Sequence, residues 1–214
     1  MKELYDYSKL LVKDLFEEYD QPFEIISNIN KFIIELGNKL SNNEFKCINE
    51  NIWIHKTAKI SSKAILVGPL IIMDNVIIRA NAYIRGNVFI GSNTLIGNSS
   101  EIKNSILLNN TKLPHFNYVG DSILGNNVHL GAGAVISNLK FDKSNVKIDG
   151  VDTKLRKLGA FIGDNVEIGC NSVICPGTVI GKNTIIYPLV MVRGIVEENK
   201  IIKKENVVAD RISV

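Results

Sequence analysis

The sequence predicts an all-β fold, a parallel β-helix of hexapeptide repeats preceded by a two-helix appendage. Two features of the chain lead to this prediction. Aliphatic residues recur every six positions, at 54, 60, 66, 72, 78, 84, 90, 96, 102 and 108, again at 124, 130 and 136, and again at 162, 168, 174, 180 and 186. Three positions after these aliphatics stands Asn, at 75, 81, 87, 93, 127, 165, 171 and 183, or Gly, at 133 and 177.

This period of six fits neither the 3.6-residue period of an α-helix nor a long alternating strand. Asn and Gly are the residues that best tolerate a positive φ. Each unit therefore combines a short strand, one inward aliphatic side chain and a tight turn. Three units complete one coil, and successive coils stack with a spacing of about 4.8 Å.

The first fifty residues instead show helical periodicity. Apolar residues between Leu4 and Leu15 recur at three-to-four spacing, and so do those between Phe23 and Leu40. The segment 20–22, Asp-Gln-Pro, ends the first helix and begins the second, with Asp20 or a neighbour as N-cap. We expect this appendage to close one end of the β-helix, because repeat stacks need polar-faced ends.

Three regions follow from these patterns: a helical appendage at 1–50, the β-helix at 51–196 and a C-terminal tail at 197–214. Within the β-helix, residues 139–158 depart from the repeat and carry six basic and three acidic side chains. A loop this long in a compact repeat protein usually serves function or assembly. The alternative is a tolerated surface insertion.

Composition restricts the class of protein. The chain has 214 residues, 45% of them hydrophobic, and a formal net charge of +3, so we expect a folded protein and no nucleic-acid partner. Its three cysteines, Cys47, Cys170 and Cys175, lack metal-ligand spacing, which favours free thiols in a reducing compartment. The longest apolar run, 64–73, is about half of the ~20 residues of a membrane helix, and no signal peptide is visible. We expect a cytoplasmic protein without a membrane partner.

Two basic residues are placed by the repeat on one face. Arg85 and Lys103 are 18 residues apart, and each follows its aliphatic by one position. They should point outward from the same face, one coil apart. Stacked like charges repel unless water screens them or an anion lies between them. The pair is therefore either two side chains that splay into solvent or a phosphate clamp.

The segment 113–118 is expected to interrupt the repeat and to lift His115 and Tyr118 over an edge of the β-helix. Asn138 is expected near the same edge, about one coil away. A histidine with a near-neutral pKa is the usual general base in acyl transfer, although a lone surface histidine is more often inert. The three histidines are too widely spaced to suggest a metal site, so we expect no metal.

The chain from about 54 to 196 resembles the C-terminal acetyltransferase domain of the bacterial bifunctional enzyme that makes UDP-N-acetylglucosamine, and the related domains of sugar-1-phosphate nucleotidyltransferases. The stretch HFNYVGDSILGNNVHLGAGAVISN is similar to that family's HLTYxGD…GxNVNxGAGTxxxN, and IGNSSEIKNS is similar to its VGNFVExKKA. TKLRKLGAFIGDNVEIG looks closest to the nucleotidyltransferase-linked, largely archaeal-type versions. The resemblance implies left-handed winding, whereas the general rule for parallel crossovers predicts the opposite hand.

The resemblance also implies an activity: N-acetyl transfer from acetyl-CoA to the amine of an amino-sugar 1-phosphate, such as glucosamine- or galactosamine-1-phosphate. It implies that His115 is the general base and that Arg85 and Lys103 hold the sugar phosphate. It assigns acceptor binding to Tyr118 and Asn138.

In the same family the coenzyme A groove lies between two subunits of a homotrimer. The resemblance therefore places the backbone of Ala132 and the side chain of Cys170 in that groove. This chain departs from the family pattern at His129, where the family has Asn, at Ser144, where it has Lys, and at Cys170, where it has Ser. These departures bear on the identity of acceptor and donor.

Nothing in 1–51 resembles the family's pyrophosphorylase domain, so we expect no nucleotidyl transfer. Two alternatives stay open. One is a different acyl acceptor, such as an amino group on a nucleotide-linked sugar. The other is a non-catalytic trimeric module that binds a sugar phosphate or partners a nucleotidyltransferase, with the two helices as its docking element.

Overall fold

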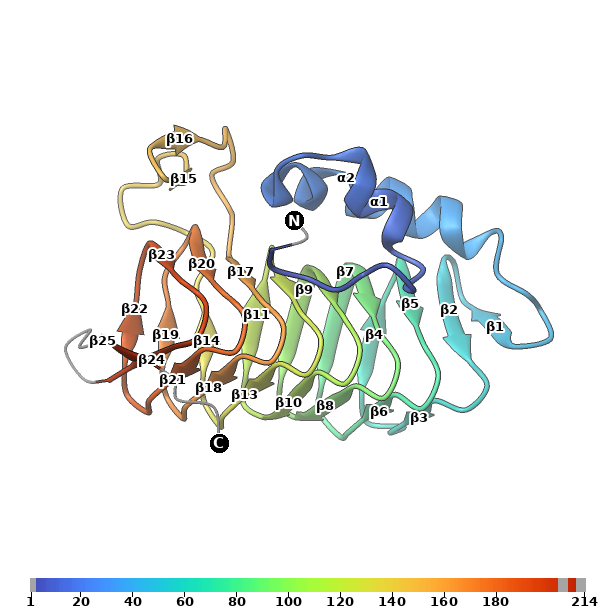
Figure 1. Ribbon diagram of the computed structural model, residues 1–214. Helices are drawn as coiled ribbons and strands as arrows, with labels where there is room; N and C mark the ends of the chain where they lie inside the picture. The colour runs from blue at the N-terminus through green and yellow to red at the C-terminus, as the bar shows by residue number, and fades with distance from the viewer. Residues whose placement is uncertain (1–2, 204–207, 211–214) are drawn as a thin grey trace.

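The chain folds into a long three-sided β-helix with two helices and a hairpin along one side (Figure 1). The structure, a computed structural model, describes residues 3–203 and 208–210. Strands pair in parallel from coil to coil, which confirms the predicted parallel β-helix of hexapeptide repeats and is consistent with left-handed winding.

The strands form three faces, in the order face 3, face 1, face 2 along each coil. Face 1 contains β4 (Ile65–Val67), the first halves of β7 (Tyr83–Ile90) and β9 (Glu101–Leu107), β11 (Tyr118–Gly120), β14 (Val135–Ile136), β19 (Val173–Ile174) and β22 (Met191–Val192). Face 2 contains β2 (Ile52–His55), β5 (Leu70–Ile72), the second halves of β7 and β9, β12 (Ile123–Leu124), β17 (Ala160–Ile162), β20 (Thr178–Ile180) and β23 (Ile195–Val196). Face 3 contains β3 (Lys59–Ile60), β6 (Ile77–Ile78), β8 (Leu95–Asn98), β10 (Lys112–His115), β13 (His129–Leu130), β18 (Glu167–Ile168), β21 (Ile185–Ile186) and β24 (Lys200–Ile202).

The corners between faces carry the positive-φ residues. All ten Asn and Gly turn positions predicted from the repeat have φ between 54° and 76°. We call the corner where each coil enters face 1 the entry edge, with positive φ at 81, 99, 116, 133, 171 and 189. The corner where each coil leaves face 1 is the exit edge, with positive φ at 87, 104, 121 and 177.

One repeat is shorter by one residue at Asn104, a position that the sequence pattern did not reveal. Leu107 pairs with Ile90 and belongs to the axial core, whereas the expected Leu108 belongs to an outer cluster. The exit edge has one residue fewer at Asn104 than in the preceding coil, and the strand register shifts there. The prediction for Leu108 is therefore wrong by one position.

The expected interruption at 113–118 is also wrong. Leu113 and Val119 both belong to the axial core and are six residues apart, so the repeat continues through this segment. The second five-residue step lies at Asp121, again on the exit edge, between Val119 and Leu124. Both shortened corners thus border face 1.

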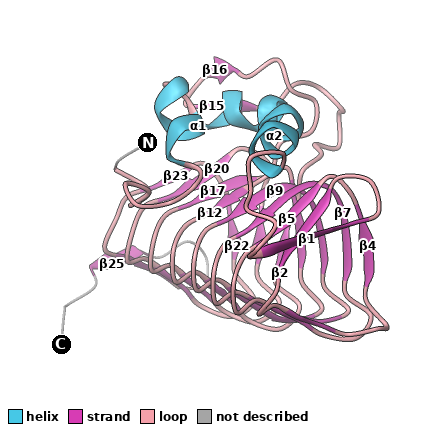
Figure 2. Cartoon of the chain, turned by 90° about the vertical axis from the view of Figure 1, so that its right-hand side faces the viewer, coloured by secondary structure: helices cyan, strands magenta, loops and turns pink. Residues whose placement is uncertain are grey.

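Face 2 is covered by the helices α1 (Lys13–Glu18) and α2 (Pro22–Gly37), which run along the β-helix (Figures 1 and 2). The expectation that they close one end is wrong. Face 2 presents a column of outward apolar side chains that must be buried: Ile71, Phe89, Ile106, Ile123 and Phe161. The helix α2 covers the column with side chains at most 4% exposed: Ile25, Ile26, Ile29 and Ile33. Strands buried on both sides read as continuous apolar runs, as on this face.

The first helix is much shorter than its apolar periodicity predicted. Part of the backbone before Lys13 bonds to the β-helix: the Asp164 amide donates to the Leu4 carbonyl at 2.9 Å, and the Asp6 amide donates to the Asp164 carboxylate at 2.7 Å. The helix α2 starts as expected near Pro22, with Gln21 as N-cap and Glu24 closing a capping box. Within the described ranges, no helix has the length and apolarity that a membrane crossing needs.

Antiparallel strands lie at the two ends of the β-helix. β1 (Phe45–Ile48) pairs with β2 at the N-terminal end, and β25 (Val208–Asp210) pairs with β24 at the other. The β-helix therefore extends beyond the predicted boundary at 196 to β24. Of the predicted terminal regions, residues 1–2, 204–207 and 211–214 lie outside the described part of the chain.

The segment 139–158 forms an arm that leaves and rejoins the β-helix at the exit edge. It contains the hairpin of β15 (Lys147–Ile148) and β16 (Val151–Asp152). The Leu158 amide donates to the Asn138 carbonyl at 3.0 Å and so closes the base of the arm. Val146 and Leu158 are buried in the same cluster as the helices, so this segment is packed rather than loose.

The contact between α2 and the first coil gives a stability prediction. A Cβ atom on Gly37 would lie 2.4 Å from ring carbons of the buried Trp53, the single tryptophan of the chain. Alanine is the better helix former by roughly 0.5–1 kcal/mol, but overlap with a packed ring outweighs this. We expect Gly37→Ala to lower the free energy of unfolding by about 1–3 kcal/mol, measured by urea denaturation with Trp53 fluorescence. The exposed Ser27→Ala should change it by less than about 0.5 kcal/mol. Equal stability of Gly37→Ala and wild type would contradict this packing.

Candidate active site

Arg85 and Lys103 lie one coil apart on face 1, as the repeat predicted. β7 and β9 pair the two residues directly, and both side chains are partly exposed. Two like charges about one coil spacing apart would repel by roughly 1–4 kcal/mol, depending on the local dielectric constant. The structure offsets this repulsion with two carboxylates.

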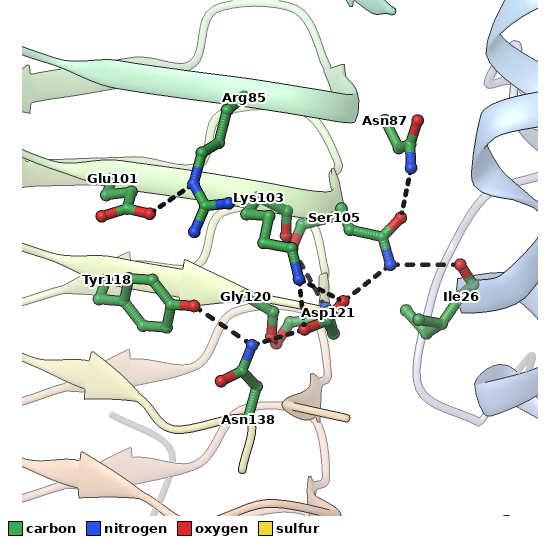
Figure 3. Close-up of polar contacts among 12 residues, drawn as sticks. Ile26, Arg85, Asn87, Glu101, Lys103, Ser105, Tyr118, Gly120, Asp121 and Asn138 are labelled. Atoms are coloured by element: carbon green, nitrogen blue, oxygen red, sulfur yellow. Dashed lines mark hydrogen bonds and ion pairs between the residues drawn. The ribbon is translucent and has the colours of Figure 1, made fainter. Parts of the chain in front are cut away.

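Each cation has its own acidic partner (Figure 3). The Arg85 Nε–H donates to Glu101 at 2.8 Å, and this hydrogen bond is the main cause that raises the pKa of Arg85. The Lys103 ammonium lies 3.3 Å from the nearer Asp121 oxygen, a looser contact. The Arg85 guanidinium carbon lies 5.8 Å from the centroid of the Tyr83 ring, but its terminal nitrogens make no hydrogen bond to the described residues, so both cations retain donors for an incoming anion.

Asp121 is the buried centre of this group. It occupies the shortened corner with φ +50° and is 3% exposed. Its carboxylate accepts hydrogen bonds from Asn104 at 2.8 Å, from Asn138 at 2.5 Å and from Lys103. A buried carboxylate needs such donors, and here they come from the two neighbouring coils: Lys103 and Asn104 from the coil before Asp121, and Asn138 from the coil after it.

Tyr118 and Asn138 meet across Gly120. The Asn138 amide donates to the Tyr118 hydroxyl at 3.2 Å. A Cβ atom at Gly120 would lie 2.6 Å from that hydroxyl and 2.8 Å from the Asn138 nitrogen, so only glycine leaves room for their contact. The structure thus brings together four of the predicted site residues, Arg85, Lys103, Tyr118 and Asn138, near the exit edge.

His115 lies at the other side of face 1. It ends β10, pairs with Asn98 and is exposed at the entry edge, so the expectation that Asn138 shares its edge is wrong. Asn138 follows β14 and contacts Asp121 at the exit edge. The His115 backbone is held by the buried Asn117, whose oxygen accepts the His115 N–H at 3.2 Å. The imidazole has no hydrogen-bond partner among the described residues.

Ala132 and Cys170 lie beside His115 along the entry edge. The Gly133 amide donates to the His115 carbonyl at 3.0 Å, and the Asn171 amide donates to the Ala132 carbonyl at 2.9 Å. These bonds place the three residues on successive coils. The thiol of Cys170 is exposed, and a Cβ atom on the neighbouring Gly131 would lie 3.0 Å from its sulfur, so this close packing needs glycine.

Three residues of the site were not predicted from the sequence: Glu101, Asn104 and Asp121. A signal for Glu101 was present, since it stands one coil below Tyr83 and two positions before Lys103. Asp121 was missed because spacing alone does not show that its side chain is buried in contact with Lys103 and Asn138.

The described residues contain no group of three metal-ligating side chains that could hold a metal ion. His129, which departs from the family pattern, lies on face 3 and bonds through Nδ1 to Glu167 at 2.8 Å. Ser144, another departure, lies in the arm and donates from its hydroxyl to Asp142 at 2.9 Å.

Comparisons with known proteins agree with the repeat. A family described as GMPPB C-terminal domain matches residues 66–154, and one described as bacterial transferase hexapeptide (six repeats) matches residues 159–194. The bifunctional protein GlmU of Methanococcus maripaludis is 41% identical over 104 residues, which are 47% of this chain and 25% of that protein. A bifunctional sugar-1-phosphate nucleotidylyltransferase/acetyltransferase of Sulfurisphaera tokodaii is 44% identical over 87 residues, 39% of this chain and 22% of that protein. The chain thus spans about a quarter of the length of these curated relatives, and the resemblance to their hexapeptide-repeat C-terminal part is confirmed.

Solved structures share the architecture only loosely. The acetyltransferase domain of PglB from Neisseria gonorrhoeae in complex with acetyl coenzyme A has 14% identity and a TM-score of 0.36, over 86% of this chain and 67% of that chain. PerB from Caulobacter crescentus in complex with CoA and GDP-perosamine has 18% identity and a TM-score of 0.30, over 85% and 67%.

The surroundings of Tyr118 give a pH prediction. Burial, then the Asp121 and Glu101 carboxylates, raise its pKa, against opposing effects of Arg85 and Asn138. The difference titration between wild type and Tyr118→Phe, followed by phenolate absorbance, should have its midpoint above the ordinary value of about 10. Because the folded-state pKa is raised, the stability linked to the neutral phenol is present below pH 10 and is lost as the pH rises through the folded pKa. A midpoint at or below 10 would show that the phenol is not enclosed in this way.

Proposed function

We propose that this hexapeptide-repeat chain, with its β-helix like the C-terminal part of GlmU-type proteins, is an N-acetyltransferase that moves acetyl from acetyl-CoA to the amine of an amino-sugar 1-phosphate. The observation that carries the proposal is the cluster on face 1. Two stacked cations with free donors, Arg85 and Lys103, lie beside a phenol and a carboxamide, Tyr118 and Asn138. A phosphomonoester fits the cations, and a sugar fits the phenol and carboxamide.

His115 is assigned as the general base. Its exposed imidazole takes a proton from the acceptor amine as the nitrogen attacks the thioester carbonyl. The C–N bond forms, the C–S bond breaks, and the CoA thiolate leaves and is protonated. Backbone N–H groups along the entry edge would stabilise the tetrahedral oxyanion. No metal is required for this route.

The donor site is assigned to the entry edge, where Ala132 and Cys170 lie next to His115. Because His115 and the phosphate-binding cluster lie on opposite sides of face 1, we assign the complete site to two copies of the chain in a homotrimer. Exposed apolar side chains support a contact surface on face 1 and its entry edge: Ile65 (59%), Phe116 (61%), Leu189 (76%) and Met191 (53%).

The alternative of a non-catalytic docking module has less support. Its docking element was to be the two helices, but their apolar side chains are already buried on face 2. Binding of a sugar phosphate without thiol release would nevertheless establish it. A nucleotide-linked acceptor would be favoured by turnover that is indifferent to a terminal phosphomonoester.

Loss of the base gives the first prediction from this function. We expect His115→Ala to lower the rate of thiol release from acetyl-CoA in the presence of glucosamine-1-phosphate by roughly 10²–10⁴. His55→Ala is the matched control, because His55 lies in the first coil and bonds to Thr57 instead of facing the site. Turnover in His115→Ala equal to that in the control would remove the assignment of the base.

The phosphate clamp gives a second prediction. Arg85→Gln and Lys103→Gln should each raise KM for glucosamine-1-phosphate by about 10- to 100-fold, because a charge-assisted hydrogen bond is lost. The KM for unphosphorylated glucosamine should change little. Arg79→Gln, which follows Ile78 on face 3 as Arg85 follows Ile84, should leave both unchanged. The clamp is refuted by variants that keep the wild-type preference for the phosphorylated sugar.

A further inference from the structure

A chain of side-chain hydrogen bonds links α2 to the buried carboxylate of Asp121, and Figure 3 shows its last two links. Asn30 of α2 donates to Asn87 at 2.7 Å, Asn87 donates to Asn104 at 3.2 Å, and Asn104 donates to Asp121 at 2.8 Å. The Asn104 amide also lies 3.4 Å from the carbonyl of Ile26, one turn earlier in α2. The helix and the site are therefore physically connected.

The Asp121 carboxylate fixes the orientation of the side-chain amides of Asn104 and Asn87 in this series of hydrogen bonds. A carboxylate paired with a lysine only accepts hydrogen bonds, so Asn104 must turn its NH₂ group toward Asp121 and its oxygen toward Asn87. The same requirement then turns the NH₂ group of Asn87 toward Asn104 and its oxygen toward Asn30. Because the bonds all run the same way, each polarises the next.

Asp121 also fixes the orientation of the hydrogen-bonding groups in the proposed acceptor site. The NH₂ group of Asn138 faces Asp121 and the Tyr118 hydroxyl oxygen, so the Asn138 carbonyl oxygen is left for a ligand. The Tyr118 hydroxyl accepts from Asn138 and keeps its hydrogen to donate. The site thus offers one carbonyl acceptor, one hydroxyl donor and the ammonium of Lys103, a pattern that suits a sugar hydroxyl beside a phosphate.

We propose that Asp121 is the positioning residue of the acceptor site and that α2 holds it in place through Asn104. Asp121 touches two residues assigned to the acceptor, Lys103 and Asn138. The helix is a firm anchor, because its apolar side chains are buried on face 2. The inference rests on the proposed function for the identity of the ligand. It makes the helical region part of the site instead of a cover alone.

The test removes one link without disturbing the backbone. Asn104→Gly keeps the positive φ of 45° and deletes the amide. Asn110→Gly is the matched control, since Asn110 has φ +61° in the same coil but is exposed on another corner. Asp121→Asn is a second variant that retains shape and removes the charge. KM and kcat are measured for glucosamine-1-phosphate and acetyl-CoA, with Tm as a check on folding.

In both test variants we expect KM for glucosamine-1-phosphate to rise roughly tenfold or more, because a hydrogen bond to a charged group is lost. The KM for acetyl-CoA should match that of Asn110→Gly. The side-chain amide signal of Asn138 in a ¹⁵N correlation spectrum, assigned by its loss in Asn138→Ser, should shift in both variants and stay in place in the control.

An unmoved Asn138 signal in Asn104→Gly, or an equal rise in both KM values, overturns the positioning role. The spectrum can be recorded without turnover. The positioning role of Asp121 can therefore be refuted independently of the acetyltransferase function. If the wild type releases no thiol while the Asn138 signal still shifts, the acetyltransferase assignment is lost and the link from α2 through Asn104 to the site is retained.

Discussion

The structure depends on one constraint: the axis-facing aliphatic side chain of each coil must lie directly over that of the coil before it. Positive-φ corners make this possible, because they return the chain to the same register after every third strand. When a corner loses a residue, as at Asn104 and Asp121, Leu107 and Leu124 still lie in the axial core. The missing residue alters only the outer corner, and at Asp121 this tighter corner places the carboxylate beside Lys103. The same regularity that builds the core therefore builds the site.

Faces 1 and 2 differ in what covers them. Face 2 is closed by α2 and by the arm at 139–158, so it contributes stability. Face 1 stays open and has two chemically distinct edges. The exit edge carries the cations, carboxylates and hydrogen-bonding groups around Asp121 (Figure 3), and the entry edge carries His115, Ala132 and Cys170. Under the proposed function, one copy supplies acceptor binding and a neighbouring copy supplies the base.

Features fixed by local geometry were predictable from the sequence. Every Asn that the period of six placed at a turn has a positive φ, and the pairing of Arg85 with Lys103 followed from counting 18 residues. Features fixed by distant contacts were not. The apolar spacing before Lys13 resembled a helix, but the backbone there bonds to Asp164, far along the chain. The edge of Asn138 was misplaced because a position on an adjacent face does not fix the corner: Asn138 follows Ile136 at the end of face 1, whereas His115 follows Leu113 at the end of face 3.

The central claim is that face 1 and His115 together perform acetyl transfer to an amino-sugar 1-phosphate. The most direct measurement is of the two products at once: free CoA thiol, and N-acetylated sugar phosphate by mass spectrometry, after wild-type protein is mixed with acetyl-CoA and glucosamine- or galactosamine-1-phosphate. The account predicts that both form in equal amounts and only when the acceptor is present. Saturable binding of the sugar phosphate with neither product would contradict it and would identify a binding module instead.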